Sequence, residues 1–221
     1  MSNLYLTKLQ KYAYDFIKDM ILSGKFLENE IYSETKLSKE IGISRTPMRE
    51  SLQRLSQEGF IDILPSKGFR LHKFSEKEII DIFQIRSAIE GYATFLLTHQ
   101  SKTPKGIETI DLLKGILKRQ EDIINSSKDI NEFAEYDTLF HTTIVSFAEN
   151  RDFNQMFNNY MYRIKKLAID SLSHPGRLEE TMKEHYDILN CICEGNIQHI
   201  YKITLKHMES PIYLNINNYC D

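Results

Sequence analysis

The stretch LSKEIGISRTPMRESLQRLSQEGFI, residues 37–61, decides the fold of the first third of this chain. Its apolar residues recur at helical spacing, and Gly42 interrupts them, so the pattern predicts two short helices joined by a bend. Ser44 or Thr46 begins the second helix, because both residue types cap helix N-termini, and Gly59 ends it. The stretch therefore reads as a helix-turn-helix.

The residues on either side extend this motif to a winged helix-turn-helix. Residues 8–23 carry apolar side chains at helical spacing and predict a helix before it. After it, the β-prone runs FIDIL and FRLHK flank the turn Pro65-Ser66-Lys67-Gly68, which predicts a β-hairpin. Three helices followed by a hairpin give a DNA-binding domain over residues 1–73.

The residues that we expect to contact DNA lie at the start of the second helix of the motif, where such helices reach base edges in the major groove. Arg45 and Arg49 suit this role, since a guanidinium bonds both major-groove acceptors of guanine. Ser44 and Thr46 can donate to phosphate oxygens at the positive helix end. The alternative is a helix cap with solvated charges on a small helical domain.

The hairpin would form the wing. Lys67 stands at its tip, close to the DNA backbone, and Gly68 beside it allows close approach. Both residues are therefore expected to contact DNA.

From Ser75 onward the pattern is helical throughout. Ser75 and Glu78 form a capping box, and Thr103-Pro104 opens a further helix. The later helices are predicted over residues 129–149, 152–172, 177–194 and 196–209. Six long helices with short links predict an antiparallel bundle over residues 74–221, so the fold class is mainly α.

Charge and composition agree with a two-part protein that acts in the cytoplasm. Residues 1–73 hold 12 lysines and arginines against nine acidic residues, a formal charge of +3, whereas residues 74–221 carry −6. A basic module joined to an acidic one fits a DNA-binding head on a second domain. No apolar run is long enough to span a bilayer, and the N-terminal residues MSNLYLTKLQKYAYDF lack the basic flank and apolar core of a signal peptide. The three cysteines form no C-x-x-C motif and are expected to be free thiols.

Four polar residues of the second domain interrupt apolar helix stripes: Asp137, His141, His185 and His207. Asp137 and His141 are four apart and face the same way. His185 and His207 both lie ~15–18 Å from the turn at Gly195, so they can meet at one level. One acid and three imidazoles suit a divalent metal ion, zinc or nickel. The alternative is a set of hydrogen-bonded core histidines.

The segment SRTPMRE, with LSKEIG before it and P-x-K-G in the wing, closely resembles the signature of the GntR-family regulators from about Gly24 to Leu71. Thr35 stands where some members carry a DNA-contacting arginine. Residues 75–209 resemble the FCD effector-binding domain of one branch of that family. The resemblance rests on D-x-x-x-H at 137–141, E-H at 184–185, K-H-M at 206–208 and R-x-x-x-E in IRSAIEGYA.

The resemblance implies a metal and a small organic acid effector in one cavity. Arg86 of the R-x-x-x-E motif would bind the acid's carboxylate, or else form an i,i+4 ion pair with Glu90. The expected protein is a homodimeric transcription regulator that binds double-stranded operator DNA, a repressor rather than an enzyme. A sensor for the metal itself and a helical metalloenzyme are the alternatives, and the sequence shows no partner acid or base for the enzyme.

Overall fold

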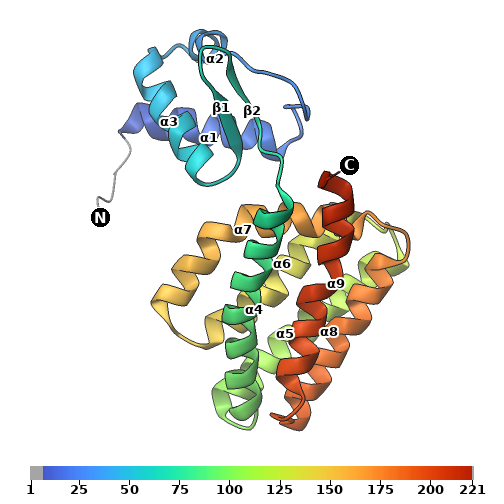
Figure 1. The fold of residues 1–221 in the computed structure, drawn as a ribbon. Helices are drawn as coiled ribbons and strands as arrows, with labels where there is room; N and C mark the ends of the chain where they lie inside the picture. Colours follow the sequence, from blue (N-terminus) through green and yellow to red (C-terminus); the bar gives the residue numbers. More distant parts are fainter. Residues whose placement is uncertain (1–6, 221) are drawn as a thin grey trace. The chain divides into compact units, whose positions relative to one another are not determined.

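The computed structural model describes residues 7–220, with side chains through Asn218. They form two compact units (Figure 1). The first unit ends at Lys73 and the second begins at Phe74. No helix in the described part of the chain combines the length and the apolar content needed to cross a membrane.

The first unit has the predicted winged helix-turn-helix architecture. Its elements are α1 (Lys8–Leu22), α2 (Glu34–Glu40), α3 (Arg45–Gln57), β1 (Ile61–Leu64) and β2 (Gly68–Leu71). The two strands pair antiparallel, with Ile61 opposite Leu71. The apolar positions of the helices and the hairpin meet in one core that includes Ile17, Met48, Leu55 and Phe69. This burial, rather than helix propensity, holds such short elements together.

The second unit is an all-helical bundle, as predicted. Its helices are α4 (Glu76–His99), α5 (Pro104–Asn125), α6 (Ile130–Phe147), α7 (Arg151–Leu172), α8 (Arg177–Glu194) and α9 (Ile200–Cys220). Helices α4 and α9 run side by side in opposite directions (Figure 1). The largest apolar cluster joins α4, α5, α6 and α8, and a smaller one joins α4 to α7 and α9.

Short polar residues cap the first four of these helices, α4 to α7. The capping box of Ser75 and Glu78 is present, with Ser75 accepting from the Glu78 amide and the Glu78 carboxylate accepting from the Ser75 amide. Thr103 caps α5, with Pro104 in its first turn. Such caps satisfy amides that have no partner inside the helix. They set the positions of the helices along the chain.

The last helix differs from the prediction of 196–209. It starts later, at Ile200, and continues through Pro211 to Cys220. A proline inside a helix removes one hydrogen bond and costs about 3 kcal/mol. Ile212 and Ile216 beyond it pack on the smaller apolar cluster, and this burial offsets the cost. Cys191 and Cys193 are free thiols, and the side chain of Cys220 lies outside the described part.

Candidate DNA interface and metal centre

The exposed start of α3 presents the four residues that the sequence singled out. Ser44, Arg45, Thr46 and Arg49 are all exposed, whereas Met48 between them is fully buried. Ser44 is the N-cap of α3, yet its side chain makes no capping hydrogen bond, unlike those of Ser33 and Ser75. The hydroxyl and the helix amides therefore remain open for an anion at this end of the helix.

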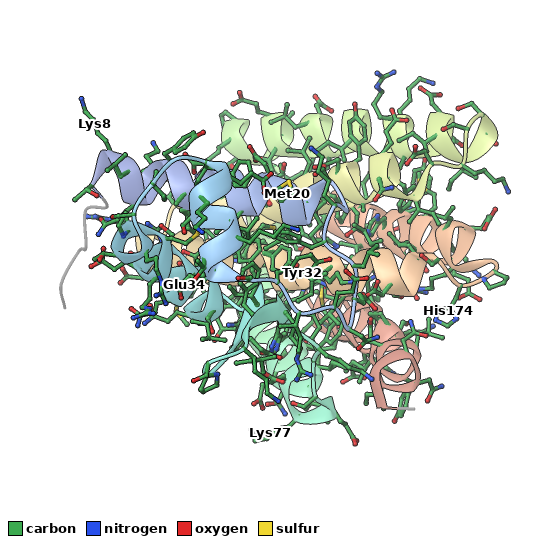
Figure 2. The ribbon with its side chains drawn as sticks, turned by 90° about the horizontal axis from the view of Figure 1, so that it is seen from above. Lys8, Met20, Tyr32, Glu34, Lys77 and His174 are labelled. Carbon is green, nitrogen blue, oxygen red and sulfur yellow. The ribbon has the colours of Figure 1, made fainter. Side chains whose placement is uncertain are left out.

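Both arginines are ion-paired with Glu34 in the first turn of α2, the acid labelled beside Tyr32 in Figure 2. Arg45 Nε lies 3.4 Å from Glu34 Oε1. Arg49 donates to both carboxylate oxygens, through Nε over 3.4 Å and Nη2 over 3.3 Å. A single acid thus connects α2 to the two candidate base-reading side chains.

The wing places Lys67 on an exposed turn between β1 and β2. Gly68, next to it, has a φ of +125°, and a Cβ there would lie 2.1 Å from the carbonyl oxygen of Tyr32. This position therefore requires glycine for the packing of the wing on the segment before α2, where Tyr32 pairs with Phe69. The close approach that the structure shows at Gly68 is to the Tyr32 carbonyl of its own chain.

Three buried histidines from three helices meet inside the second unit. His141 comes from α6, His185 from α8 and His207 from α9, and one ring nitrogen of each lies within 4.8 Å of the others. The Nε2 atoms of His141 and His207 are 3.2 Å apart. Asp137 Oδ1 lies 3.4 Å from His185 Nε2 and 3.8 Å from His141 Nε2. The structure therefore brings all four sequence-predicted residues together, with the histidines as the tighter set.

Each histidine has a partner at its other ring nitrogen. His141 Nδ1 lies 2.5 Å from Glu90 Oε2, and His207 Nδ1 lies 2.8 Å from Glu184 Oε2. The remaining Nδ1, of His185, lies 3.0 Å from the amide oxygen of Gln120. Oxygen acceptors at Nδ1 place the proton on that nitrogen in a neutral imidazole and leave a lone pair on Nε2. Three lone pairs then point into one buried space.

This arrangement fits a bound metal ion. Ligand atoms held ~2.0–2.1 Å from a tetrahedral ion lie about 3.3 Å from each other. The 3.2 Å between two histidine nitrogens and the 3.4 Å from Asp137 Oδ1 to His185 Nε2 agree with that spacing. The 3.8 Å from Asp137 Oδ1 to His141 Nε2, and separations of up to 4.8 Å among the histidine nitrogens, require these side chains to draw closer around an ion. His185 Nε2 is buried and makes no hydrogen bond. Metal-binding histidines characteristically donate their other N–H to a carboxylate or carbonyl oxygen, and His185 and His207 have such partners. His141 Nδ1 lies close to the Glu90 carboxylate, although without the geometry of a hydrogen bond.

Two buried arginines hold the carboxylates in place. Arg86 donates from Nε to Glu90 Oε1 over 2.8 Å, and both side chains are almost fully buried. The i,i+4 ion pair of Arg86 with Glu90, the alternative drawn from the sequence, is therefore present, and it lies inside the protein. On the opposite side, Arg177 bonds both oxygens of Glu184, over 3.1 and 2.7 Å. Each chain of contacts runs from an arginine through a glutamate to a histidine.

A small cavity of about 20 Å³ adjoins the histidines. Its wall includes Arg86, Arg177, Asp137, His141 and His207. Arg86 Nη2 and Arg177 Nε are buried without a hydrogen-bond partner. These two free N–H donors lie beside the candidate metal site and could bind an anion there, because each can form a charge-assisted hydrogen bond. Such a volume holds about one water-sized group.

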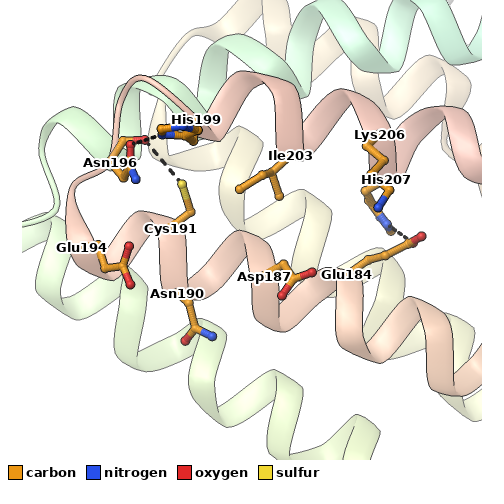
Figure 3. A pocket seen from close by; sticks show the side chains of 10 residues that line it. All are labelled: Glu184, Asp187, Asn190, Cys191, Glu194, Asn196, His199, Ile203, Lys206 and His207. Atoms are coloured by element: carbon orange, nitrogen blue, oxygen red, sulfur yellow. Dashed lines mark hydrogen bonds and ion pairs between the residues drawn. The ribbon is translucent and has the colours of Figure 1, made fainter.

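A larger and more open cavity, of about 410 Å³, lies between α8 and α9 (Figure 3). Asp187, Asn190 and Glu194 line one wall from α8, and Ile203 and Lys206 line the other from α9. His207 and Glu184 stand at one end, joined by their hydrogen bond (Figure 3). The carboxylate that orients a candidate metal ligand is therefore reachable from this second cavity.

The sequence did not identify the outer partners Gln120, Glu184 and Arg177. Gln120 carries a signal, since it is a fully buried polar residue in the apolar stripe of α5 beside Leu117 and Ile123. Glu184 was noted only as the neighbour of His185. Its role depends on Arg177, seven residues earlier on the same helix face, and on a histidine from another helix. Only the tertiary fold joins them.

Burial and neighbouring charges perturb the titration of this cluster. Burial lowers the pKa of His185 well below its usual value, and the charges of the neighbouring residues add to this. Burial likewise lowers the pKa of His207, although its hydrogen bond to Glu184 opposes the shift. Burial alone would raise the pKa of Glu90, but the charges of Arg86 and His141 hold it at about 2.

We expect the metal-free protein to lose stability when the pH falls from about 7.5 to about 5.5. His185 binds fewer protons in the folded chain than in the unfolded chain, so unfolding is favoured once the pH drops below ~6.5. The depressed pKa of Glu90 acts only at lower pH, below ~4.5. Melting temperatures of chelator-treated protein across this range test the expectation. His185→Phe should flatten the dependence, and equal slopes for the two proteins would contradict it.

Both units of the chain match families of known proteins. Residues 9–71 match the family model described as bacterial regulatory proteins, gntR family, and residues 81–210 match the FCD domain model. The chain is 32% identical to the gluconate operon transcriptional repressor of Bacillus licheniformis over 77% of this chain and 67% of that protein. It is 26% identical to the transcriptional regulator YdhC of Bacillus subtilis over 88% of this chain and 85% of that protein.

Solved structures share the fold. A GntR regulator from Rhodococcus superposes with a TM-score of 0.75 at 14% identity, covering 96% of this chain and 100% of that one. McbR/YncC of Escherichia coli superposes with a TM-score of 0.71 at 18% identity, covering 96% and 99%. The curated relatives are transcriptional regulators and not enzymes, which removes the metalloenzyme alternative.

Proposed function

Because this chain belongs to the GntR family of transcription regulators and carries the FCD domain of one branch of that family, we propose that it is a homodimeric, cytoplasmic repressor. In this proposal, a small organic acid bound beside a metal ion sets the affinity of the protein for operator DNA. The observation that carries the proposal is the convergence of three buried histidines, each with a side-chain oxygen of Glu90, Gln120 or Glu184 close to its Nδ1 atom.

The metal ligands in this proposal are His141, His185, His207 and Asp137. Three imidazoles and one carboxylate favour zinc or nickel over calcium or magnesium, which prefer oxygen ligands. Asp137 Oδ1 lies 3.4 Å from His185 Nε2, the distance expected between two ligands of one ion, which supports Asp137 as the fourth ligand. When bound, the ion supplies a positive Lewis-acid position at which a carboxylate oxygen can coordinate.

The DNA-reading residues in this proposal are those at the start of α3 and at the wing tip. A homodimer would place its two α3 helices in successive major grooves of a pseudo-palindromic operator. Arg45 and Arg49 would read base edges, and Ser44 and Thr46 would bond phosphates. Lys67, with Gly68 beside it, would approach the backbone at the wing.

The effector in this proposal is a small acid bound by Arg86 and the ion. The unused donors of Arg86 and Arg177 support an anion, and one relative is named for the operon of gluconate, itself a sugar acid. The adjoining cavity of about 20 Å³ is too small for such a molecule, so its binding requires side chains or helices to move. If the acid binds one arrangement of the protein more tightly than the other, it shifts the protein toward that arrangement and so changes its affinity for DNA.

Stepwise titration tests this function. Operator affinity is measured on metal-free protein, then with zinc or nickel added, and then with a panel of organic acids. The proposal expects an acid to change DNA affinity only when the metal is present. If no acid changes it but the metal alone does, the protein is a metal sensor. The small cavity favours that second candidate, since it leaves no space for an acid without rearrangement.

Glu184 gives a sharp test of the metal site. Glu184→Gln should weaken metal affinity by roughly 10- to 100-fold, because the carboxylate that orients His207 is lost while its shape is kept. Glu180→Gln on the same helix is the matched control, since Glu180 is largely exposed and contacts Arg177 but no histidine. Competition with a zinc-binding dye measures both affinities. Equal affinities for the two variants would contradict the role of Glu184.

Arg86→Lys tests the effector site better than removal of the side chain. Truncating Arg86 would leave the buried Glu90 charge unpaired, which destabilises a protein by about 3–5 kcal/mol. Lysine keeps a charge near Glu90 but lacks the fork that places Nη2 in the cavity. We expect Arg86→Lys to keep operator affinity and to weaken the effect of an active acid at least ten-fold. An unchanged acid titration would leave the metal as the only anchor.

A further inference from the structure

We propose that Glu34 is a specificity-determining residue, which positions Arg45 and Arg49 for base reading without contacting DNA bases itself. The inference rests on the proposed function, because it presumes that these two arginines read the operator. It concerns an acid that faces the expected DNA surface, where a negative charge by itself opposes binding to phosphates. The contacts of Glu34 explain why an acid stands there.

The carboxylate of Glu34 is well placed to act as a support. Its side chain is 19% exposed, against 62% for Arg45 and 57% for Arg49. It lies in the first turn of α2, directly after the N-cap Ser33, where the helix dipole favours a negative charge. The acid is thus the more buried member of the cluster, and the two arginines are the more exposed members.

The atoms used in these contacts leave the reading edges open. Arg45 meets Glu34 through Nε, and Arg49 meets it through Nε and Nη2. Both terminal nitrogens of Arg45 remain for base acceptors, and Arg49 keeps Nη1 and the second hydrogen of Nη2. A bidentate bond to guanine O6 and N7 needs two donors in a fixed plane. Fixing one edge of a guanidinium restricts that plane and reduces the entropy lost on binding.

The contacts are long for charge-assisted bonds, at 3.3–3.4 Å, and exposed pairs add little to stability. Their effect should therefore appear in DNA selectivity and not in folding. Without Glu34, the arginines can turn toward phosphates, which raises binding to any sequence and lowers the advantage of the correct one. Loss of one negative charge acts in the same direction.

The test compares full-length wild type with Glu34→Gln and with the matched control Glu40→Gln, which removes an exposed acid from the same helix. The probes are a duplex selected by wild type from a library randomised over about two helical turns (~20 base pairs), and a scrambled duplex of equal composition. Affinities for both are measured at one salt concentration.

We expect Glu34→Gln to lower the ratio of selected to scrambled affinity by about ten-fold, with tighter binding to the scrambled duplex and relaxed base preference in a repeated selection. Glu40→Gln should keep the ratio. If Glu34→Gln strengthens binding to both duplexes equally, Glu34 only repels DNA and the inference is wrong. Arg45→Ala and Arg49→Ala run in parallel: a ratio unchanged in both would overturn the base-reading function itself, whereas a loss there with no effect of Glu34→Gln overturns the positioning role alone.

Discussion

Treating the protein with a chelator should lower its melting temperature by about 5–15 °C, and adding zinc or nickel should restore it. A ligand present at 100 to 1,000 times its Kd stabilises the folded state by about 2.7–4.1 kcal/mol. For a chain of this size each kcal/mol shifts the melting temperature by roughly 2–4 °C. The physical reason is the set of buried Nε2 lone pairs and Asp137, which only a cation or protons can satisfy.

Variants separate this effect from general damage. His185→Ala and His207→Ala should melt at one temperature with and without metal, because each removes a ligand. His199→Ala is the matched control, since His199 is exposed on the turn before α9 and lies outside the histidine cluster. It should keep the full metal response. A metal response retained in both ligand variants would show that the ion binds elsewhere.

Replacing Arg45 or Arg49 with alanine should weaken specific DNA binding by about 1–3 kcal/mol, a five- to 150-fold loss, and relax base preference. Both arginines are exposed at the start of α3, whereas Met48 on the same helix is fully buried and anchors it in the core. The helix itself should therefore be unaffected by either substitution. Gel-shift titrations with a duplex selected by wild type measure the loss at fixed salt.

Lys67→Ala provides the contrast. A lysine at the wing tip that contacts phosphate should weaken all sequences alike and reduce the slope of affinity against salt by about one. Unchanged affinity in both arginine variants would remove the start of α3 from the interface.

The fold was predictable because its signals are local. Gly42 between two helical runs, the Ser75–Glu78 capping box and Pro104 at a helix start each specify backbone structure within a few residues. The prediction was wrong at the C-terminus, where the last helix runs past Pro211 to Cys220 and not only to residue 209. There the burial of Ile212 and Ile216 against α4 and α7 outweighs the local preference, and burial of this kind is not visible in the sequence.

In the candidate metal site, the sequence predicted the ligands themselves but not the residues that hold them. His141, His185 and His207 are polar residues inside apolar stripes, which marks them as buried and in need of partners. Which acceptors hold their other nitrogens depends on how five helices pack. Gln120 is 65 residues from His185, and Glu184 is 23 residues from His207. Spacing along the chain carries no information about such pairs.

The ion pairs of the reading head show the same limit. Glu34 precedes Arg45 by 11 residues and Arg49 by 15, across the turn of the motif. The sequence identified the arginines from their position on α3, whereas their common acid became visible only when α2 and α3 were in place.

Metal content is the most direct test of the account. Elemental analysis of the full-length protein, dialysed against metal-free buffer after loading with zinc or nickel, should find one ion per chain in wild type. The loss of one ligand in His185→Ala should leave far less, and X-ray absorption on the wild-type protein should show nitrogen and oxygen ligands without sulfur. Wild-type protein that retains no stoichiometric metal would contradict the account, and a proton shared between His141 and His207 would then satisfy the cluster in place of an ion.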